Sequence, residues 1–456
     1  MKKLIVLLTA VAFVACNQQK PIDYAIVSGK ILNANSDKIT LYNEYDFDEK
    51  KEILITEEGT FLDTITLAQN QKYLLSENNN GINLFLSKGD DTSITYDAKK
   101  LDSTIVISGV GSDINKYLHE KAVLTGMIYE ACKKEEADYK KHLVEQKSQK
   151  MALLDAQTSF SEDLIQKEKN NIQYEYLLGI SVYQTYHRYF TGNKDFKPSE
   201  GFDDELSSLT FDKEEDFLFS TSYRMLIQDQ FAKKSSEKND TITPYGIQML
   251  KTFSSIENHL IKNKLLFDTA NLQISFTEDL ETFYKTYSEA STSEENDARI
   301  DKVYNALKLL GKGNTSPEFV DYENYAGGTV SLSDLKGKYV YIDVWATWCG
   351  PCKAEIPSLK KVEKQFHGKN IEFVSISIDN KEDHEAWKKM IVDKELGGTQ
   401  LFADNDWQSK FIQDYMIKGI PRFILIDPSG NIVNSNAPRP SNKKLAELFD
   451  ELLNKA

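Results

Sequence analysis

Cysteine and histidine are scarce in this chain. Only four cysteines and six histidines occur among its 456 residues. Four cysteines are too few to staple a disulfide-rich scaffold. The histidines form no HExxH pattern, and the single Cys-X-X-Cys pair has no second pair to complete a zinc site. The sequence therefore predicts no metal centre.

Basic residues are outnumbered by acidic ones. The chain has 55 Lys and Arg against 70 Asp and Glu, which gives a formal net charge of −15. Proteins that bind nucleic acid carry a basic surface for the phosphates. We therefore expect no nucleic-acid partner, and the acidic surplus is typical of a soluble, self-repelling surface.

The apolar run at the start of the chain is too short for a transmembrane helix. It covers residues 4–15 after the basic Met1-Lys2-Lys3, whereas a span needs about 20 residues. The run has the length of a signal peptide. Ala15-Cys16 at its end resembles a bacterial lipoprotein cleavage site, although Phe13 departs from the usual leucine. The alternative is simple secretion.

That resemblance implies a signal peptide at 1–15, a lipid on Cys16 and a tether at 16–22. The protein would then lie on the periplasmic side of a cell-envelope membrane, anchored by acyl chains. This compartment is oxidising, so a reducing thiol pair in it would need a membrane electron donor.

A cysteine pair stands where a predicted strand passes into a predicted helix. Residues 341–357 read YIDVWATWCGPCKAEIP, with Cys349 and Cys352 at the helix start. Free amide donors and the positive dipole end of a helix stabilise a thiolate there. Such placement lowers a cysteine pKa from about 8.5 to about 3.5–7.5. We therefore expect Cys349 to attack disulfides and Cys352 to resolve the mixed disulfide.

These motifs resemble the thioredoxin superfamily, in its TlpA/ResA-like branch of periplasmic lipoproteins. Trp348 to Lys353 (WCGPCK) matches the thioredoxin motif, and Glu355-Ile356-Pro357 matches the Glu-x-Pro that follows it in this branch. The match covers about the last third of the chain. It implies a thiol-disulfide oxidoreductase whose redox centre is the Cys349–Cys352 disulfide, with no further cofactor.

The resemblance also implies an α/β thioredoxin-like domain at 311–456. Its substrate groove would involve Trp348, the Gly350-Pro351 dipeptide, and Ile420 followed by a cis Pro421. From the residues themselves, Gly350 permits a tight bend. Pro351 pre-sets a helical φ at the helix start.

Two carboxylates near the cysteines are candidates for catalysis. Asp343 lies six residues before Cys349 on an apolar strand, where burial would raise its pKa and suit it to accept a proton from Cys352. A structural hydrogen bond is the alternative. Glu355 matches a glutamate that tunes the cysteines in ResA-like proteins. The alternative for Glu355 is a solvated helix charge.

Residues 23–310 are expected to form two further modules. Short β-rich runs separated by Asn, Asp and Gly predict a small all-β antiparallel sandwich or barrel at 23–110. The layout resembles a β-rich domain that precedes thioredoxin modules in Bacteroidetes-type lipoproteins. Apolar residues at three- and four-residue spacing predict an all-α module at 111–310. We expect a spacer or docking role for the β-rich module, with a ligand site as the alternative.

The leading hypothesis is a protein-disulfide reductase acting on protein or peptide substrates. The Gly-Pro dipeptide resembles that of reducing thioredoxins rather than that of strong oxidants. The alternatives are a partner-binding lipoprotein with secondary redox chemistry, and a disulfide isomerase or oxidase. A peroxidase is disfavoured, because peroxiredoxins place Thr three residues before the reactive cysteine and Ala346 stands there.

Overall fold

The computed structural model describes residues 22–77, 80–125, 128–236 and 243–454. It divides into two compact units, Met1–Gln230 and Phe231–Ala456. This division falls inside the predicted helical module 111–310. The predicted signal peptide, Cys16 and all but the last residue of the predicted tether lie outside the described residues. Within the described ranges, no helix combines the length and apolar character that crossing a bilayer requires.

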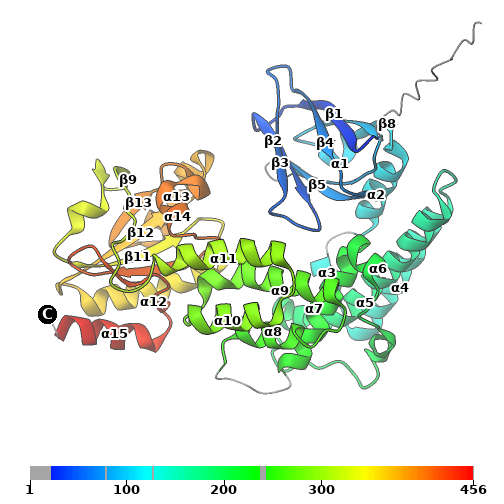
Figure 1. The fold of residues 1–456 in the computed structure, drawn as a ribbon. Helices are drawn as coiled ribbons and strands as arrows, with labels where there is room; N and C mark the ends of the chain where they lie inside the picture. Colours follow the sequence, from blue (N-terminus) through cyan, green and yellow to red (C-terminus); the bar gives the residue numbers. More distant parts are fainter. Residues whose placement is uncertain (1–21, 78–79, 126–127, 237–242, 455–456) are drawn as a thin grey trace, which may run out of the picture. The chain divides into compact units, whose positions relative to one another are not determined.

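The first unit begins with a β-rich module (Figure 1). It has two four-stranded sheets, in the orders β4-β1-β7-β8 and β3-β2-β5-β6. The strands are β1 (Tyr24–Leu32), β2 (Lys38–Asn43), β3 (Lys50–Leu54), β4 (Thr60–Thr66), β5 (Gln71–Glu77), β6 (Asn80–Leu86), β7 (Asp91–Asp97) and β8 (Val106–Val110), with the short helix α1 (Leu101–Thr104) before β8.

Alternating side chains of both sheets form one apolar core. Val27, Leu41 and Ile94 are among its fully buried members. Such alternation marks strands with one buried face. The sequence predicted this β-rich module, but its antiparallel pairing is only partly right, because β1 pairs with β7 in parallel.

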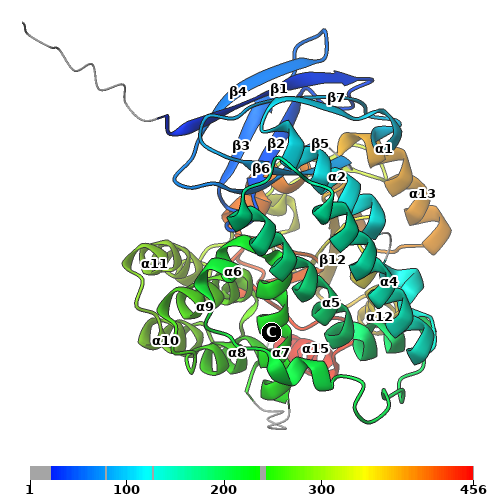
Figure 2. The same cartoon turned by 90° about the vertical axis from the view of Figure 1, so that its right-hand side faces the viewer.

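Helices follow in the same unit. They are α2 (Ser112–Thr125), α3 (Ile128–Cys132), α4 (Glu136–Asp155), α5 (Glu162–Thr191), α6 (Glu214–Phe219) and α7 (Thr221–Ser236), which carries the unit boundary. Figure 2 shows α4 and α5 running beside each other, and they pack together. Ser161 caps α5 by accepting from the Leu164 N–H, and Gly192 ends it in the left-handed conformation that glycine favours.

The second unit opens with helices α8 (Tyr245–Phe253), α9 (His259–Gln273), α10 (Leu280–Ala290) and α11 (Glu294–Lys308), with a 3-10 turn η2 (Ile274–Phe276) after α9. The sequence predicted one helix at 245–265. Two helices form instead, because the Asn258 side chain caps α9 by accepting from the Ile261 N–H.

A seven-stranded sheet completes the second unit, in the order β10-β9-β13-β12-β11-β14-β15. Its strands are β9 (Tyr322–Asn324), β10 (Thr329–Val330), β11 (Tyr339–Trp345), β12 (Ile371–Ser377), β13 (Thr399–Phe402), β14 (Arg422–Ile426) and β15 (Ile432–Asn434). Its helices are α12 (Gly350–Phe366), α13 (His384–Lys394), α14 (Lys410–Asp414) and α15 (Lys443–Asn454).

Helices α12 and α15 cover one face of this sheet (Figure 1). Tyr341 of β11 is central to their shared core, with Phe366 of α12 and Phe449 of α15. The thioredoxin-like α/β fold predicted for 311–456 is thus present. The apolar face of β11 packs against α12, the helix that carries the cysteines.

Helix α9 and its 3-10 turn are joined to the start of β14. The Arg422 guanidinium donates to the carbonyls of Ser275 and Ser435, the second at 3.0 Å. The Asn436 side chain donates to the Phe276 carbonyl at 2.6 Å. The helices before residue 311 therefore contribute packing to the sheet that holds the cysteines.

Candidate active site

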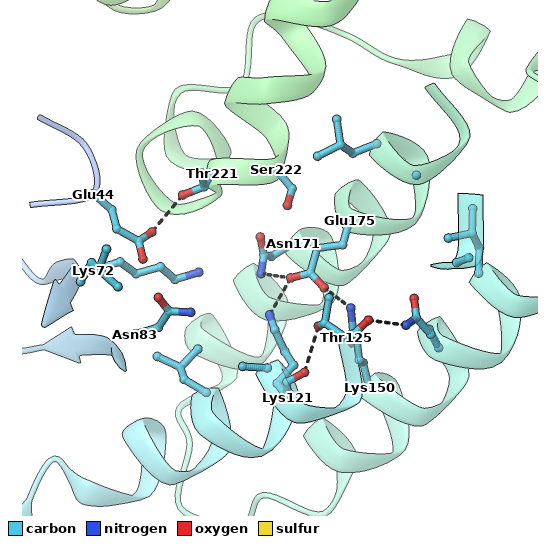
Figure 3. Close-up of a pocket in the computed structure, with 18 of the residues that line it drawn as sticks. Glu44, Lys72, Asn83, Lys121, Thr125, Lys150, Asn171, Glu175, Thr221 and Ser222 are labelled. Carbon is cyan, nitrogen blue, oxygen red and sulfur yellow. Dashed lines mark hydrogen bonds and ion pairs between the residues drawn. The ribbon is translucent and has the colours of Figure 1, made fainter. Parts of the chain in front are cut away.

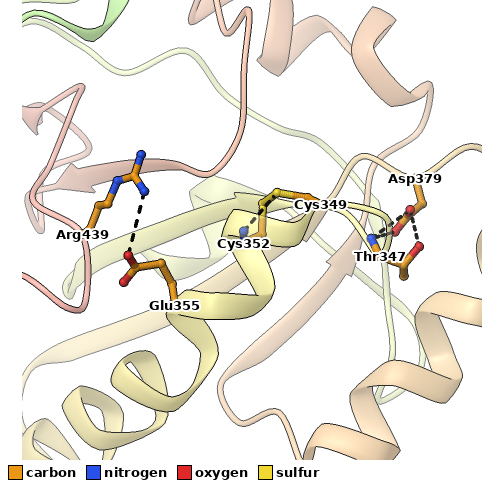
Figure 4. The surroundings of a disulfide bond; sticks show 6 residues. All are labelled: Thr347, Cys349, Cys352, Glu355, Asp379 and Arg439. Atoms are coloured by element: carbon orange, nitrogen blue, oxygen red, sulfur yellow. Dashed lines mark hydrogen bonds and ion pairs between the residues drawn. A yellow bond between two sulfur atoms is a disulfide. The ribbon is translucent and has the colours of Figure 1, made fainter. Parts of the chain in front are cut away.

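The two cysteines lie at the N-terminal end of α12, directly after the interior strand β11 (Figure 4). Cys349 is the N-cap residue, and a disulfide joins it to Cys352, with the Cα atoms 5.3 Å apart. The backbone N–H of Cys352 donates to Sγ of Cys349 at 3.1 Å. Both residues are buried. The helix start therefore directs an amide donor at the Cys349 sulfur, which favours an anion there.

Gly350 and Pro351 open the first turn of α12. Pro351 is placed as predicted, where a missing N–H costs nothing. Gly350 is the first residue of α12, and its φ is not left-handed. A Cβ added at Gly350 would meet nothing within 4 Å. Glycine therefore leaves open space beside the cysteine pair and does not relieve a strained turn.

The loop before β14 lies next to the end of β11. The Ile420–Pro421 peptide bond is cis, the geometry that the family resemblance implies. Arg422 pairs with Val344, so Pro421 stands one residue beyond this pair, toward the end of the strand that leads to the cysteines. Pro421 is buried, and Ile420 is half-buried.

Trp348 immediately precedes Cys349 and is 53% exposed. Its ring lies 6.4 Å from that of Trp407, between ring centroids. An exposed aromatic surface beside a reactive sulfur can contact an apolar part of a substrate.

Asp343 is buried in the middle of the sheet, opposite Ser375 of β12 and Phe423 of β14. In the described part of the chain, its Oδ1 atom has no hydrogen-bond partner. Burial, followed by the charges of Glu355 and Glu363, raises the pKa of Asp343 to about 8. A carboxyl that titrates near neutral pH can both accept and release a proton.

Glu355 is a buried acceptor and not a solvated helix charge. Its Oε2 accepts from the Ser441 N–H at 3.0 Å, and its Oε1 accepts from the Ser441 hydroxyl at 2.9 Å. Arg439 lies 3.9 Å from Oε1 (Figure 4). These contacts fix the carboxylate on the face of α12, one turn after Cys352.

Sequence reasoning missed Asp379, which holds the loop that leads to the cysteines. Its carboxylate accepts from the Thr347 N–H at 3.0 Å and from the Thr347 hydroxyl at 2.7 Å (Figure 4). It also accepts from the Ser377 hydroxyl at 2.7 Å. Asp379 is only 1% exposed. The sequence does contain a signal for this residue, because Asp379 follows the apolar strand β12 closely. The carboxyl ends of the parallel strands β11 and β12 lie at the same edge of the sheet, where ligands and chemistry gather.

The C-terminal part of the chain is similar to a known protein family. The Redoxin family model matches residues 311–452. The thiol-disulfide oxidoreductase ResA of Bacillus subtilis (strain 168) is 31% identical over 137 residues, which are 29% of this chain and 72% of that protein. ResA of Oceanobacillus iheyensis is 32% identical over 130 residues, which are 27% of this chain and 64% of that protein.

A solved structure is similar to about a third of the chain. A Bacteroides vulgatus protein described as a thiol-disulfide oxidoreductase is 50% identical; the match covers 32% of this chain and 93% of that one, with a TM-score of 0.28. The match to the family model includes the cysteine pair, and each of these matches covers about a third of the chain or less. On the identity to Bacillus subtilis ResA, the chain is an oxidoreductase that belongs to the TlpA/ResA-like thiol-disulfide oxidoreductases of the thioredoxin superfamily.

Proposed function

We propose that this protein reduces disulfide bonds in proteins or peptides through Cys349 and Cys352, outside the cytoplasm. The Cys349 thiolate attacks one sulfur of the substrate disulfide, so that a mixed disulfide forms and one substrate thiolate leaves. The Cys352 thiolate then attacks Sγ of Cys349 and releases the second substrate thiolate. Two electrons pass to the substrate, and the protein is left with the Cys349–Cys352 disulfide.

The observation that carries this proposal is the 3.1 Å contact between the Cys352 N–H and Sγ of Cys349. An amide donor at a helix start stabilises the sulfur in its anionic form, which is the nucleophile. Cys352 takes the resolving role because it lies one helical turn further along α12.

Asp343 is proposed as the group that takes the proton of Cys352. Its Oδ1 has no partner among the described residues, and its pKa is raised to about 8 by burial and by Glu355 and Glu363. The proton leaves the Cys352 thiol as this sulfur attacks Cys349. Glu355 tunes the step by its charge, because its carboxylate favours the protonated form of Asp343.

The substrate groove is proposed to involve Trp348, the Gly350-Pro351 turn and the Ile420-Pro421 loop. An extended peptide can pair with backbone groups beside such a loop. The open space at Gly350 and the exposed ring of Trp348 support this assignment. Anchoring through a lipid on Cys16 and resupply of electrons from a membrane donor are parts of the same proposal.

Trapping the mixed disulfide tests the assignment of the two cysteines. The reduced Cys352→Ser variant, mixed with insulin, should form a covalent adduct through Cys349 that mass spectrometry identifies. The Cys349→Ser variant should form none and should not reduce insulin. Cys132→Ser is the matched control, because Cys132 is buried and far along the chain from the pair, and it should behave as the wild type. Adducts on Cys352 in the Cys349→Ser variant would reverse the two roles.

A further inference from the structure

The first unit contains a cavity of about 590 Å³ that the redox chemistry does not use (Figure 3). Strands β5 and β6 and helices α2, α4 and α5 all contribute to its walls. Pockets of about 300–1,000 Å³ are typical of small-molecule sites. The cavity is thus large enough for a small organic ligand.

Buried charged side chains form one wall of the cavity. Lys121 and Lys150 each lie 2.8 Å from the carboxylate of Glu175, on its two different oxygens. Lys121 also lies 2.8 Å from Glu168, which is fully buried behind the wall, and Lys72 lies 3.3 Å from the other oxygen of Glu168. Figure 3 shows the ammonium groups of Lys72, Lys121 and Lys150 converging on the centre of this region.

Three members of this cluster, Glu168, Lys121 and Glu175, are held in their charged forms. Burial opposes ionisation of Glu168, but Lys72 and Lys121 lower its pKa to about 2. Burial likewise opposes the charge on Lys121 and Glu175. Their opposite partners nevertheless raise the pKa of Lys121 and lower that of Glu175. His142 also lines the cavity, and burial, followed by the charge of Lys134, lowers its pKa, which disfavours a further positive charge there.

The buried cluster has one positive charge more than it can pair. Three ammonium groups (Lys72, Lys121 and Lys150) face two carboxylates (Glu168 and Glu175). An ammonium has three donors, and within the described part of the chain Glu175 is the one acceptor of Lys150 Nζ. Only 5% of the Lys150 side chain is exposed, and it lines the cavity, so its other donors are reached from the cavity.

The remaining walls of the cavity are largely apolar. Leu74 of β5, Leu118 of α2, and Leu143 of α4 and Leu178 of α5 all line it. We propose that this cavity is a binding site for a small organic anion, in which a carboxylate meets Lys150 and Lys121 and an apolar body packs against the leucines. Such a ligand would accept charge-assisted hydrogen bonds from Lys150, whose ammonium has donors beyond the one that Glu175 accepts.

The carboxylate of Glu44 also lines the cavity and provides a test of the charge of the ligand. Its side chain lines the cavity from the β-rich module, and its Oε2 accepts from the Thr221 hydroxyl at 2.9 Å. A carboxylate in the lining repels an anion. Removing this charge should therefore strengthen the binding of an anionic ligand and weaken that of a cationic one.

Calorimetric titration of the full chain tests the proposal. The probes are octanoate and 4-phenylbutyrate, which separate a fatty-acyl source from an aromatic one, with 4-phenyl-1-butanol and 4-phenylbutylamine as neutral and cationic counterparts. At least one carboxylate should bind, and the alcohol and the amine should bind at least tenfold more weakly. Charge-assisted hydrogen bonds commonly contribute that much.

Variants locate the binding. Lys150→Met should weaken carboxylate binding about tenfold or more. Lys141→Met on the same helix is the matched control, because its side chain is 74% exposed, and it should change nothing. Glu44→Gln should strengthen binding. Ala122→Phe is the second variant, to be used if Lys150→Met folds poorly. Ala122 also lines the cavity, and a phenyl ring there should block it and abolish binding. The proposal is overturned if neither carboxylate binds or if the amine binds as tightly as the carboxylates. It is also overturned if Glu44→Gln weakens the binding of the carboxylates.

Discussion

The backbone amide of Cys352 donates a hydrogen bond to the sulfur of Cys349, at 3.1 Å. This contact follows from helix geometry, because Cys349 is the N-cap of α12 and the amides of the first turn lack partners within the helix. The same amide remains in place when residue 352 is replaced by serine. The electrostatic effect on Cys349 can therefore be measured without the disulfide.

The first prediction concerns the acidity of Cys349. In the Cys352→Ser variant, the rate of alkylation by iodoacetamide should follow a titration with a pKa near 7, below the ordinary value of about 8.5. Cys132 is an internal control, because burial raises the pKa of its thiol and it should stay unreactive in the folded protein. A midpoint at or above about 8.5 would mean that the helix start does not activate Cys349.

The second prediction concerns Asp343 and the pH dependence of stability. Its pKa is raised from 3.8 to about 8 by burial and by Glu355 and Glu363, so the folded state binds more protons than the unfolded state between these values. The contribution of this raised pKa to the unfolding free energy is therefore fully present below pH 3.8. It is lost as the pH rises toward 8.

Replacing Asp343 by Asn should remove this loss. From pH 5 to pH 8, the unfolding free energy of Asp343→Asn should rise relative to that of the wild type, by at most about 1.4 kcal/mol per pH unit. Urea unfolding of the oxidised proteins measures this difference. Asp393→Asn is the control at an exposed carboxylate and should show no such trend. A difference that is flat across this range would contradict a raised pKa for Asp343.

The third prediction concerns the charge of Glu355. Its carboxylate is the first of the two charges that raise the pKa of Asp343. Glu355→Gln should therefore lower that pKa below about 8, as followed by the infrared band or NMR shift of the Asp343 carboxyl. Glu385→Gln, at a side chain that is 85% exposed, should leave the pKa unchanged. An upward shift in Glu355→Gln would reject the proposed coupling.

The fourth prediction concerns Asp379, which holds Thr347 in place. Asp379→Asn converts a buried carboxylate that accepts from Thr347 and Ser377 into an amide with one acceptor oxygen. Stability should fall by about 1–3 kcal/mol, because at least one buried donor loses its partner. The Asp393→Asn variant again serves as the matched control. Equal stability of the two variants would show that Asp379 does not hold the loop.

The redox site was largely predictable from the sequence, because its information is local. A strand, a Cys-X-X-Cys pair and a helix start are adjacent in the chain, so their chemistry follows from short-range rules. Asp379 is 30 residues after Cys349 in the sequence and matches no motif. Its contact with Thr347 depends on the pairing of β12 with β11, which is a long-range contact of the tertiary structure.

The long helices were also predictable, and the errors have physical causes. Residues 136–155 show a helical period and fold as α4. The prediction of a single helix at 245–265 was wrong, because the apolar spacing continues past Phe253, where α8 ends. The side chain of Asn258 caps the start of a second helix, α9. The parallel pairing of β1 with β7 joins distant segments and leaves no local pattern. The lysines and glutamates of the cavity could not be told from surface charges, because composition does not report burial.

The reduction potential of the Cys349–Cys352 pair in the full chain tests the central claim most directly. Equilibration with glutathione or dithiothreitol, followed by alkylation and mass spectrometry, gives the value. The account predicts a potential near or below about −250 mV, close to that of thioredoxin, which reduces substrate disulfides. A potential above about −180 mV would contradict it, because such a pair would form or rearrange disulfides instead.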